Sequence, residues 1–363
     1  MSLLLRQKLP DFPWDALAPY GEIARTHPQG AIDLSVGTPV DPTPEFIQQA
    51  LRQSADSPSY PVTMGTQELR TAIHYWAVTT LGATGDFAVL PLIGSKEFVA
   101  WLPTFLESAT VLYPRIAYPT YLVGALLAQA APTAVDIDAT TWPMADLAWV
   151  NSPSNPTGRV HSESELRAAI EWSRKNKSVV VSDECYLEFG DTKTPASILR
   201  YTDGDNTNVL GVYSLSKRSS MAGYRAAFVV GDPQLIARIL EVRKHAGMMV
   251  SLPVQHAMVA ALSDSNHVAE QRGRYNARRT RLVPALISAG FTIDHSEAGL
   301  YIWATRNESS WDSVAWLAAL GILATPGIFY GQAGENHIRI ALTATDQQIA
   351  TAAERILAKA SGR

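Results

Sequence analysis

Six short apolar runs, each followed by small or polar residues, are the feature that most constrains the fold of this chain. They are AVLPLI (88–93), ATVLYP (109–114), LAWVNS (147–152), SVVVSD (178–183), NVLGVYS (208–214) and AAFVVGD (226–232). Strands that are apolar along their whole length suit a sheet that is buried on both faces, as when helices cover a mostly parallel sheet. Because helical patterns separate the runs, the sequence predicts an α/β fold with a mostly parallel central sheet flanked by helices.

Start and stop signals mark helices among these runs. Thr43 followed by Pro44 predicts an N-cap with proline at the first helical position. Ser162 and Glu165 have the spacing of a capping box before an apolar run. Gly82 is expected to close the amphipathic helix before it, since glycine accepts the left-handed conformation of helix ends.

The pattern changes after about residue 250, where longer helices and shorter strands follow. We therefore expect an N-terminal segment (1–45) that packs with the smaller domain, a large α/β domain (46–250) and a small α+β C-terminal domain (251–363). Within the last part, RGRYNARRTR (272–281) is interpreted as the solvated face of a helix, with an anion site as the alternative.

Composition and motifs exclude several classes of function. A net charge of −4 over 363 residues gives no reason to expect nucleic acid as a partner. No apolar run is long enough for a signal peptide or a membrane span, so we expect a cytoplasmic protein that acts on small molecules. The chain lacks a phosphate-binding Gly-Lys loop, a His-Glu-x-x-His helix and paired cysteines, and no metal site is predicted.

Polar residues gather just beyond the ends of the predicted strands. In chain order they are Ser95, Asn151, Asn155, Asp183, Ser214 and Lys217. In open α/β sheets, ligands bind outside the carboxyl ends of the strands. We therefore expect these side chains to meet in one crevice.

Lys217 is the residue in this set with the most specific chemistry. At the end of a buried strand, desolvation lowers the pKa of a lysine amine, which then becomes a nucleophile able to form a Schiff base. Ser214, Ser216 and Arg225 suit a phosphate dianion, and Gly94 with Ser95 opens a helix whose free N–H groups favour an anion. A surface lysine and an ordinary helix cap are the alternatives. Together these residues predict a pyridoxal phosphate site.

Pyridoxal phosphate needs a carboxylate beside its ring nitrogen, and Asp183 is placed to supply it. The alternative is that Asp183 only caps the next segment. Tyr186 and Asn155 are candidates to donate to the phenolate oxygen of the cofactor. Cys185, next to Asp183, is interpreted as a small packing residue and not as a nucleophile.

Four motifs appear in a fixed order: NSPSNPTG (151–158), SDECY (182–186), SLSKRSSMAGYR (214–225) and HIRIAL (337–342). They resemble the successive signatures of the class I/II pyridoxal phosphate aminotransferases, which have the aspartate aminotransferase-like fold type I. The resemblance runs from about Gly37 to Arg339, over most of the chain.

The resemblance implies a role for each matching position. Lys217 would form the Schiff base and then move a proton as a free amine, and Asp183 would pair with the ring nitrogen. Tyr118 would stack on the ring, although core packing is its alternative. The remaining implied contacts to the cofactor come from Gly94, Ser95, Lys96, Asn155, Tyr186, Ser214, Ser216 and Arg225.

Three further positions match residues that contact the substrate or a second subunit. Arg339 matches the arginine that holds the substrate α-carboxylate, and Gly37 matches a glycine whose backbone approaches the same carboxylate. Tyr60 matches a tyrosine that reaches the phosphate of the neighbouring subunit, so the resemblance implies a homodimer.

The segment SLSKRS with AGYRAAFVVGD resembles the N-succinyldiaminopimelate aminotransferases of actinobacteria. That subgroup moves an amino group from glutamate to N-succinyl-2-amino-6-oxopimelate in lysine biosynthesis. Ser220 departs from its asparagine, and Ala117 from the proline or glycine of many relatives. Such a substrate needs cationic or polar groups for its distal carboxylates, and the sequence offers Lys96, Arg115, Arg243 and Lys244 as candidates without ranking them.

Three other functions remain as alternatives. A carbon-sulfur lyase would use the same cofactor and motifs, because the site selects which bond breaks. An aminotransferase of other specificity, for aspartate among others, would differ only in the side-chain pocket. A regulatory protein without turnover is the remote alternative.

Overall fold

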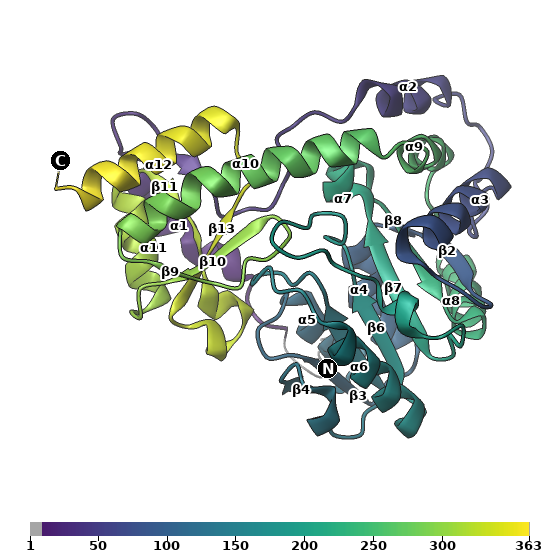
Figure 1. Cartoon of the computed structure of the whole chain (residues 1–363). Helices are drawn as coiled ribbons and strands as arrows, with labels where there is room; N and C mark the ends of the chain where they lie inside the picture. The colour runs from purple at the N-terminus through teal and green to yellow at the C-terminus, as the bar shows by residue number, and fades with distance from the viewer. Residues whose placement is uncertain (1–8, 363) are drawn as a thin grey trace, which may run out of the picture.

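The computed structural model describes residues 9–362. A seven-stranded sheet forms its largest layer, with the strand order β2-β8-β7-β6-β5-β3-β4 (Figure 1). β8 is antiparallel to both of its neighbours, and the other neighbouring pairs are parallel. The strands are β2 Ala88–Ile93, β3 Thr110–Pro114, β4 Ala131–Val135, β5 Leu147–Asn151, β6 Val179–Asp183, β7 Val209–Ser214 and β8 Ala226–Gly231. The predicted α/β fold with a mostly parallel sheet is confirmed.

Helices cover both faces of this sheet, as its apolar strands require. α4, α5 and α8 cover one face, and α3, α6 and α9 cover the other. They are α3 Gln67–Trp76, α4 Ser95–Phe105, α5 Thr120–Leu127, α6 Glu163–Asn176, α8 Pro233–Ala246 and α9 Leu252–Leu262. Side chains alternate along β6, with Val180 facing the second layer and Val181 the first, so Asp183 faces the layer that contains α4 and α5.

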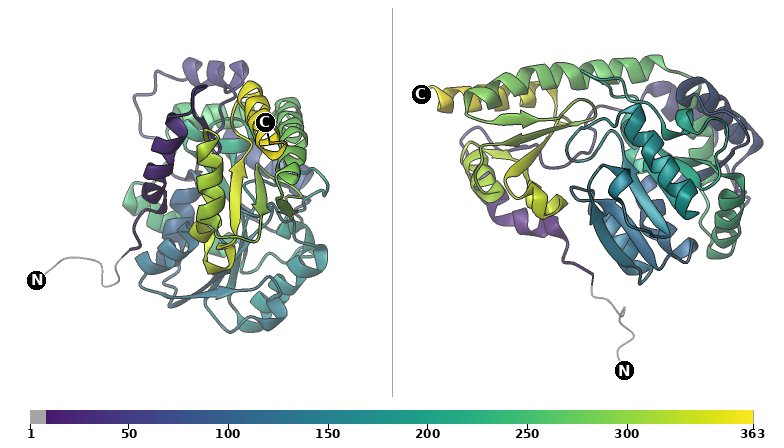
Figure 2. Two further views of the ribbon diagram at one scale, coloured as in Figure 1. Left: turned by 90° about the vertical axis from the view of Figure 1, so that its left-hand side faces the viewer. Right: turned by 60° about the horizontal axis from the view of Figure 1, so that its bottom comes forward.

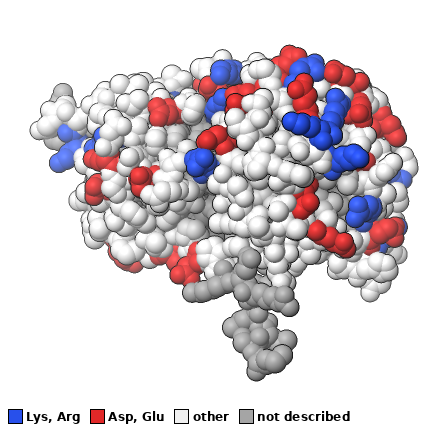
Figure 3. Space-filling view, turned by 90° about the horizontal axis from the view of Figure 1, so that it is seen from below, with Lys and Arg blue, Asp and Glu red and all other residues white. Residues whose placement is uncertain are grey.

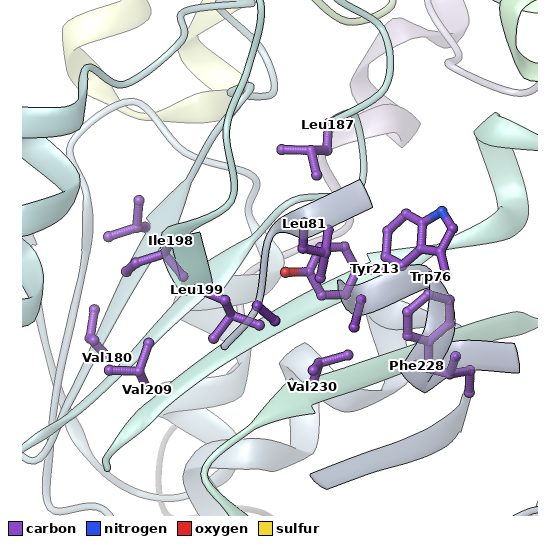
Figure 4. Close-up of a cluster of buried hydrophobic side chains, with 14 of the residues drawn as sticks. Trp76, Leu81, Val180, Leu187, Ile198, Leu199, Val209, Tyr213, Phe228 and Val230 are labelled. Atoms are coloured by element: carbon purple, nitrogen blue, oxygen red, sulfur yellow. The ribbon is translucent and has the colours of Figure 1, made fainter. Parts of the chain in front are cut away.

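Three aromatic side chains pack among aliphatic residues in the core on the α3 side of the sheet (Figure 4). The ring of Trp76 meets Tyr213 edge-on at 5.2 Å between centroids and Phe228 at 5.3 Å. Edge-to-face pairs of this kind contribute about 0.5–1.5 kcal/mol each beyond the area they bury. This cluster fixes the end of β7, the strand that leads directly to Lys217.

The helix signals are confirmed in two of three cases. Ser162 and Glu165 form the predicted capping box of α6. Gly82 ends the π-helical turn that continues α3, with φ of 72°. The prediction for Thr43 was wrong, because α2 (Glu45–Gln53) has Pro44 as its N-cap and Thr43 Oγ1 donates instead to the Ser220 carbonyl at 2.7 Å.

A second, antiparallel sheet with the order β12-β13-β10-β9 lies beside the large one (Figure 2). Its strands are β9 Thr292–Asp294, β10 Tyr301–Thr305, β12 Thr325–Pro326 and β13 His337–Ala341. Nearby, β1 (Ile32–Asp33) pairs with β11 (Ile322–Leu323). The helices of this part are α1 Ala18–Arg25, α10 Asn266–Ser288, α11 Ser310–Ala319 and α12 Asp346–Ala360. The predicted domain limits stay a prediction.

The basic stretch 272–281 lies in α10 and corrects one expectation. Arg272 is exposed, as a solvated face requires, but Arg278 and Arg279 are buried. Arg278 pairs with Asp41 at 2.7 Å and with Asp346 at 2.6 Å. Two buried guanidinium groups therefore fasten α10 to its neighbours, and only part of the stretch faces water.

The surface seen from below carries Lys and Arg interspersed with Asp and Glu, without a field of one sign (Figure 3). Among residues 9–362, no helix is long and apolar enough to cross a bilayer. The same residues contain no group of three His, Cys, Asp or Glu side chains that could hold a metal ion.

Candidate active site

A cavity of about 720 Å³ opens where β5, β6 and β7 end, between the two sheets. The predicted site residues that line it are Gly37, Ser95, Lys96, Tyr118, Asn155, Asp183, Tyr186, Ser214, Ser216, Lys217, Arg225 and Arg339. The crevice expected from the strand ends therefore exists in the structure. Tyr60 and Gly94 are not among the lining residues.

Lys217 lies in α7 (Leu215–Arg218), a single helical turn directly after β7. Ser214 caps this turn, because its Oγ accepts a hydrogen bond from the Ser216 N–H at 3.2 Å. The Lys217 ammonium donates to the Gly37 carbonyl. Burial, together with the positive charges of Arg339 and Arg225, lowers the pKa of Lys217, which favours the neutral amine.

Asp183 ends β6 and is only 7% exposed. Its Oδ2 accepts a hydrogen bond from Tyr121 Oη at 2.9 Å, and its Oδ1 accepts one from the Cys185 N–H at 3.2 Å. Burial raises the pKa of Asp183, since the ion pairs of the described residues give it no cationic partner. A cation placed beside Asp183 would therefore be strongly stabilised.

The start of α4 and the Arg225 guanidinium form an anion-binding end of the cavity. Gly94 precedes the helix with φ of 77°, and a Cβ there would lie 2.2 Å from Arg225 Nη2. Glycine is therefore required both for the backbone conformation and for the close approach of Arg225. The free N–H groups of Ser95 and Lys96 in the first turn add to the preference for an anion.

Arg339, on β13, is buried without a carboxylate partner among the described residues. Its Nη1 donates to Asn155 Oδ1 at 3.0 Å, and its Nη2 donates to the Ser35 carbonyl. Its Nε has no partner in residues 9–362. A buried guanidinium with an unused donor suits a ligand carboxylate.

Tyr301, on β10, is a site residue that the sequence analysis missed. Its Oη lies 3.2 Å from Tyr186 Oη, and its ring lies 4.2 Å from the Arg339 guanidinium carbon. A Cβ at Gly37 would come within 2.1 Å of Tyr301 Oη, so no larger residue fits there. Within the strand LYIWAT, Tyr301 has the pattern of a core aromatic, and no signal in the sequence distinguishes it.

Tyr121, on α5, was also missed, although it follows the predicted Tyr118 by three residues. Tyr118 lies before the helix, so helical spacing gives no signal for Tyr121, although the two rings meet edge-on at 6.0 Å between centroids. Burial raises the pKa of Tyr118 to about 12 and that of Cys185 well above its usual value. Both side chains therefore stay protonated beside the cavity.

Only one of the four cations expected at the distal end of a substrate lines the cavity, and it is Lys96. Arg115 pairs with Asp136 at the surface, and Lys244 pairs with Glu241. Arg243 is fully buried against Glu97 at 2.9 Å. These three candidates do not line the cavity, and their role toward a substrate stays a prediction.

The family model of class I and II aminotransferases matches residues 29–356. The chain belongs to this aminotransferase family. Its members depend on pyridoxal phosphate, as the four motifs imply. The structure fits that cofactor, since one cavity combines a partly buried amine, a buried acid without a cation and an anion-binding end at Ser95, Lys96 and Arg225.

Two curated relatives share about half of their aligned residues with this aminotransferase. A probable aminotransferase of Mycobacterium tuberculosis is 52% identical over 96% of this chain and 85% of its own length. The 4-dedimethylamino-4-oxo-anhydrotetracycline transaminase of Streptomyces rimosus is 51% identical over 96% of this chain and 99% of its own.

A solved structure extends the comparison. The probable N-succinyldiaminopimelate aminotransferase of Thermus thermophilus superposes with a TM-score of 0.87 at 25% identity, over 96% of this chain and 100% of that chain. The fold and the aminotransferase family are therefore common to all of these proteins.

Proposed function

We propose that this aminotransferase is a cytoplasmic homodimer that moves an amino group from L-glutamate to N-succinyl-2-amino-6-oxopimelate, giving N-succinyl-LL-diaminopimelate for lysine biosynthesis. The observation that carries the transamination is that Lys217, Asp183 and Arg339 line one cavity. An amine, an acid for the ring nitrogen and a carboxylate-binding arginine are the three groups that the reaction needs.

The residues that would hold pyridoxal phosphate divide by the part of the cofactor they suit. Asp183 would face the ring nitrogen, and Asn155 with Tyr186 the phenolate oxygen. Arg225, Ser214, Ser216 and the start of α4 would bind the phosphate. Bound there, the cofactor supplies an electron sink for the substrate Cα.

Lys217 would anchor the cofactor and act as the base. Its lowered pKa increases the fraction of neutral amine, which can accept the proton of the substrate Cα. Arg339 would bind the α-carboxylate with two N–H groups of its guanidinium, one to each carboxylate oxygen. This contact would hold the substrate Cα within reach of the Lys217 amine. Because Gly37 has no side chain, its backbone lies close to Tyr301. The Gly37 backbone would therefore limit the space around the same carboxylate.

The succinylated acceptor is favoured by two observations. The Thermus structure, which shares the fold over nearly the whole chain, is named for that reaction. Lys96 lines the cavity and makes no ion pair within the described residues, so its ammonium is available for a distal carboxylate. The segment SLSKRS with AGYRAAFVVGD, which resembles the same subgroup, also supports this choice.

A second candidate acceptor is a ring ketone on a flat polycyclic compound. The relative from Streptomyces rimosus, 51% identical, is named for such a substrate. The cavity also has an aromatic wall, to which Phe12, Trp14, Tyr118 and Tyr301 contribute. Flat aromatic ligands bind well against aromatic side chains.

A substrate panel tests these proposals. Purified protein loaded with pyridoxal phosphate is assayed with glutamate or aspartate as donor and with the succinylated semialdehyde, oxaloacetate or the tetracycline ketone as acceptor. We expect the highest kcat/KM for glutamate with the succinylated compound. A clear preference for oxaloacetate or for the ketone contradicts this acceptor, and release of pyruvate from cystathionine without an acceptor indicates the lyase.

The variant Lys96→Met separates the two acceptors, because it removes the charge and keeps most of the side-chain length. We expect KM for the succinylated acceptor to rise about tenfold, the loss of one charge-assisted hydrogen bond. KM for the uncharged ketone should not change. An equal change for both compounds would show that Lys96 does not read the distal carboxylate.

A further inference from the structure

A chain of hydrogen bonds runs from the segment that follows Lys217 to the long helix α10. Ser219 Oγ lies 2.9 Å from His267 Nε2, and His267 Nδ1 lies 2.6 Å from Asp264 Oδ1. The Ser219 N–H donates to the Leu215 carbonyl at 3.1 Å, so Ser219 also closes the helical turn that carries Lys217. His267 belongs to the first turn of α10.

The order serine, histidine, aspartate is that of a hydrolytic triad, but the surroundings of Ser219 argue against hydrolysis. Ser219 is 1% exposed, and Arg218 Nη1 occupies its Oγ at 3.3 Å. Ser219 borders a cavity of about 570 Å³, but its side chain is buried and its Oγ already has two hydrogen-bond partners. These hydrogen bonds therefore fix the position of the backbone at Ser219 and do not supply a nucleophile.

The protonation state of His267 determines which atoms donate and which accept in its hydrogen bonds to Ser219 and Asp264. Burial lowers the pKa of His267, with Arg218 lowering it further, while Asp264 and Glu188 act in the opposite direction. In the neutral ring, Nδ1–H donates to Asp264 and Nε2 accepts from the Ser219 hydroxyl. Phe46 meets the ring edge-on at 5.5 Å and restricts its rotation.

The same helix contacts the opposite wall of the cavity. Arg279 donates to the Tyr301 carbonyl at 2.9 Å and to the Gly299 carbonyl at 2.7 Å. With a rise of about 1.5 Å per residue, the twelve residues from His267 to Arg279 span roughly 18 Å. Figures 1 and 2 show α10 running past both sheets along one side of the molecule.

We propose that His267 is a positioning residue for Lys217, and that α10 keeps the Lys217 amine and the Tyr301 ring at a fixed separation across the cavity. His267 fixes α10 relative to Lys217 through Ser219, and Arg279 fixes the same helix relative to Tyr301. The inference rests on the role proposed above for Lys217 and adds a residue that touches neither substrate nor cofactor.

The test replaces His267 in the cofactor-loaded protein and reads the cofactor's visible absorbance against pH. In His267→Leu the pH midpoint of the absorbance band should shift from that of the wild type, because the lysine attached to the cofactor is displaced. We expect kcat to fall about tenfold, and KM for glutamate to stay within about twofold because Arg339 and Gly37 keep their contacts. Ser219→Ala should give the same shift, and the double variant no larger one.

The matched control is His245→Leu, which changes an exposed histidine of α8. If His267→Leu has the midpoint and kcat of this control, and only its melting temperature falls, His267 is merely structural and the proposal is wrong. Should His267→Leu fail to fold, Ser219→Ala decides the same question alone. Lys217→Ala must remove the pH-dependent band of the lysine-bound cofactor, and the same pH midpoint persisting there contradicts the role of Lys217 instead.

Discussion

Asp183 and Glu184 are adjacent acids with opposite surroundings. Asp183 faces the cavity, whereas Glu184 is buried away from it and accepts the Ile198 N–H at 2.7 Å. Burial raises the pKa of Glu184 to about 7, so this side chain is partly protonated near neutral pH. Successive side chains of an extended segment point to opposite faces. Asp183 therefore faces the cavity, and Glu184 faces the loop that contains Ile198.

The pair gives a matched test of the role of Asp183. Asp183→Asn removes the charge expected to face the pyridinium, and losing one partner of a buried ion pair costs about 3–5 kcal/mol. We expect kcat/KM to fall by roughly 100- to 4,000-fold in steady-state assays. Glu184→Gln, the control, should keep activity close to that of the wild type. Equal losses in both variants would remove the distinction.

His161 offers a residue-scale test of stability against pH. Burial, and then the charge of Arg159, lowers its pKa to about 4 from the ordinary 6.5, although Glu165 and Glu297 oppose the change. The unfolded chain binds a proton that the folded chain does not, so the stability from this group is complete above about pH 6.5 and is lost as pH falls toward 4. His161→Asn should flatten the fall of urea midpoints over this window. An unchanged slope would contradict this explanation.

At the scale of elements, the sequence predicted what is local and continuous. The six apolar runs are six strands, because burial on both faces needs no alternation of polar residues. β4 was missed because this edge strand is only half buried, and its sequence APTAV carries no long apolar run. Thr43 has the chemistry of an N-cap, but a distant carbonyl at Ser220 takes its hydroxyl.

The capping box of α6 predicts a measurable loss. Ser162→Ala removes the acceptor for the Glu165 N–H at 3.3 Å and should cost about 1 kcal/mol, lowering Tm by roughly 1–2 °C. Ser251→Ala, at the exposed N-cap of α9 where the serine makes no side-chain cap bond, is the control and should change Tm little. Similar shifts in the two variants would show that the cap contributes no more than any surface serine.

At the scale of the whole molecule, the sequence predicted the site residues that belong to a motif. It did not predict those that come to the site only through the fold. Lys217, Asp183 and Arg339 stand in recognisable motifs, and they line one cavity. Tyr301 and Tyr121 lie in segments that look like ordinary core. Distal cations could not be chosen from the sequence, because a nearby acid decides whether each side chain reaches the cavity.

Tyr60 is the remaining large-scale prediction. It is 95% exposed and lies outside the cavity, as a residue that serves a second subunit would. If it completes the neighbouring site, Lys217→Ala and Tyr60→Ala subunits, each weakly active alone, should regain activity when unfolded together and refolded as a mixture. Random pairing restores roughly one site in four. Activity of the mixture equal to the average of the two variants would contradict a shared site.

The hydrogen bond from Lys217 to the Gly37 carbonyl joins the reactive amine to a segment that continues from β1. An amine that engages a ligand must give up this bond, so the backbone around Gly37 loses an anchor at the moment the lysine is occupied. Amide hydrogen exchange at Thr38 and its neighbours should therefore become faster when the cofactor is bound, unless a bound carboxylate replaces the lost hydrogen bond. Exchange in this segment would then report whether Lys217 is occupied.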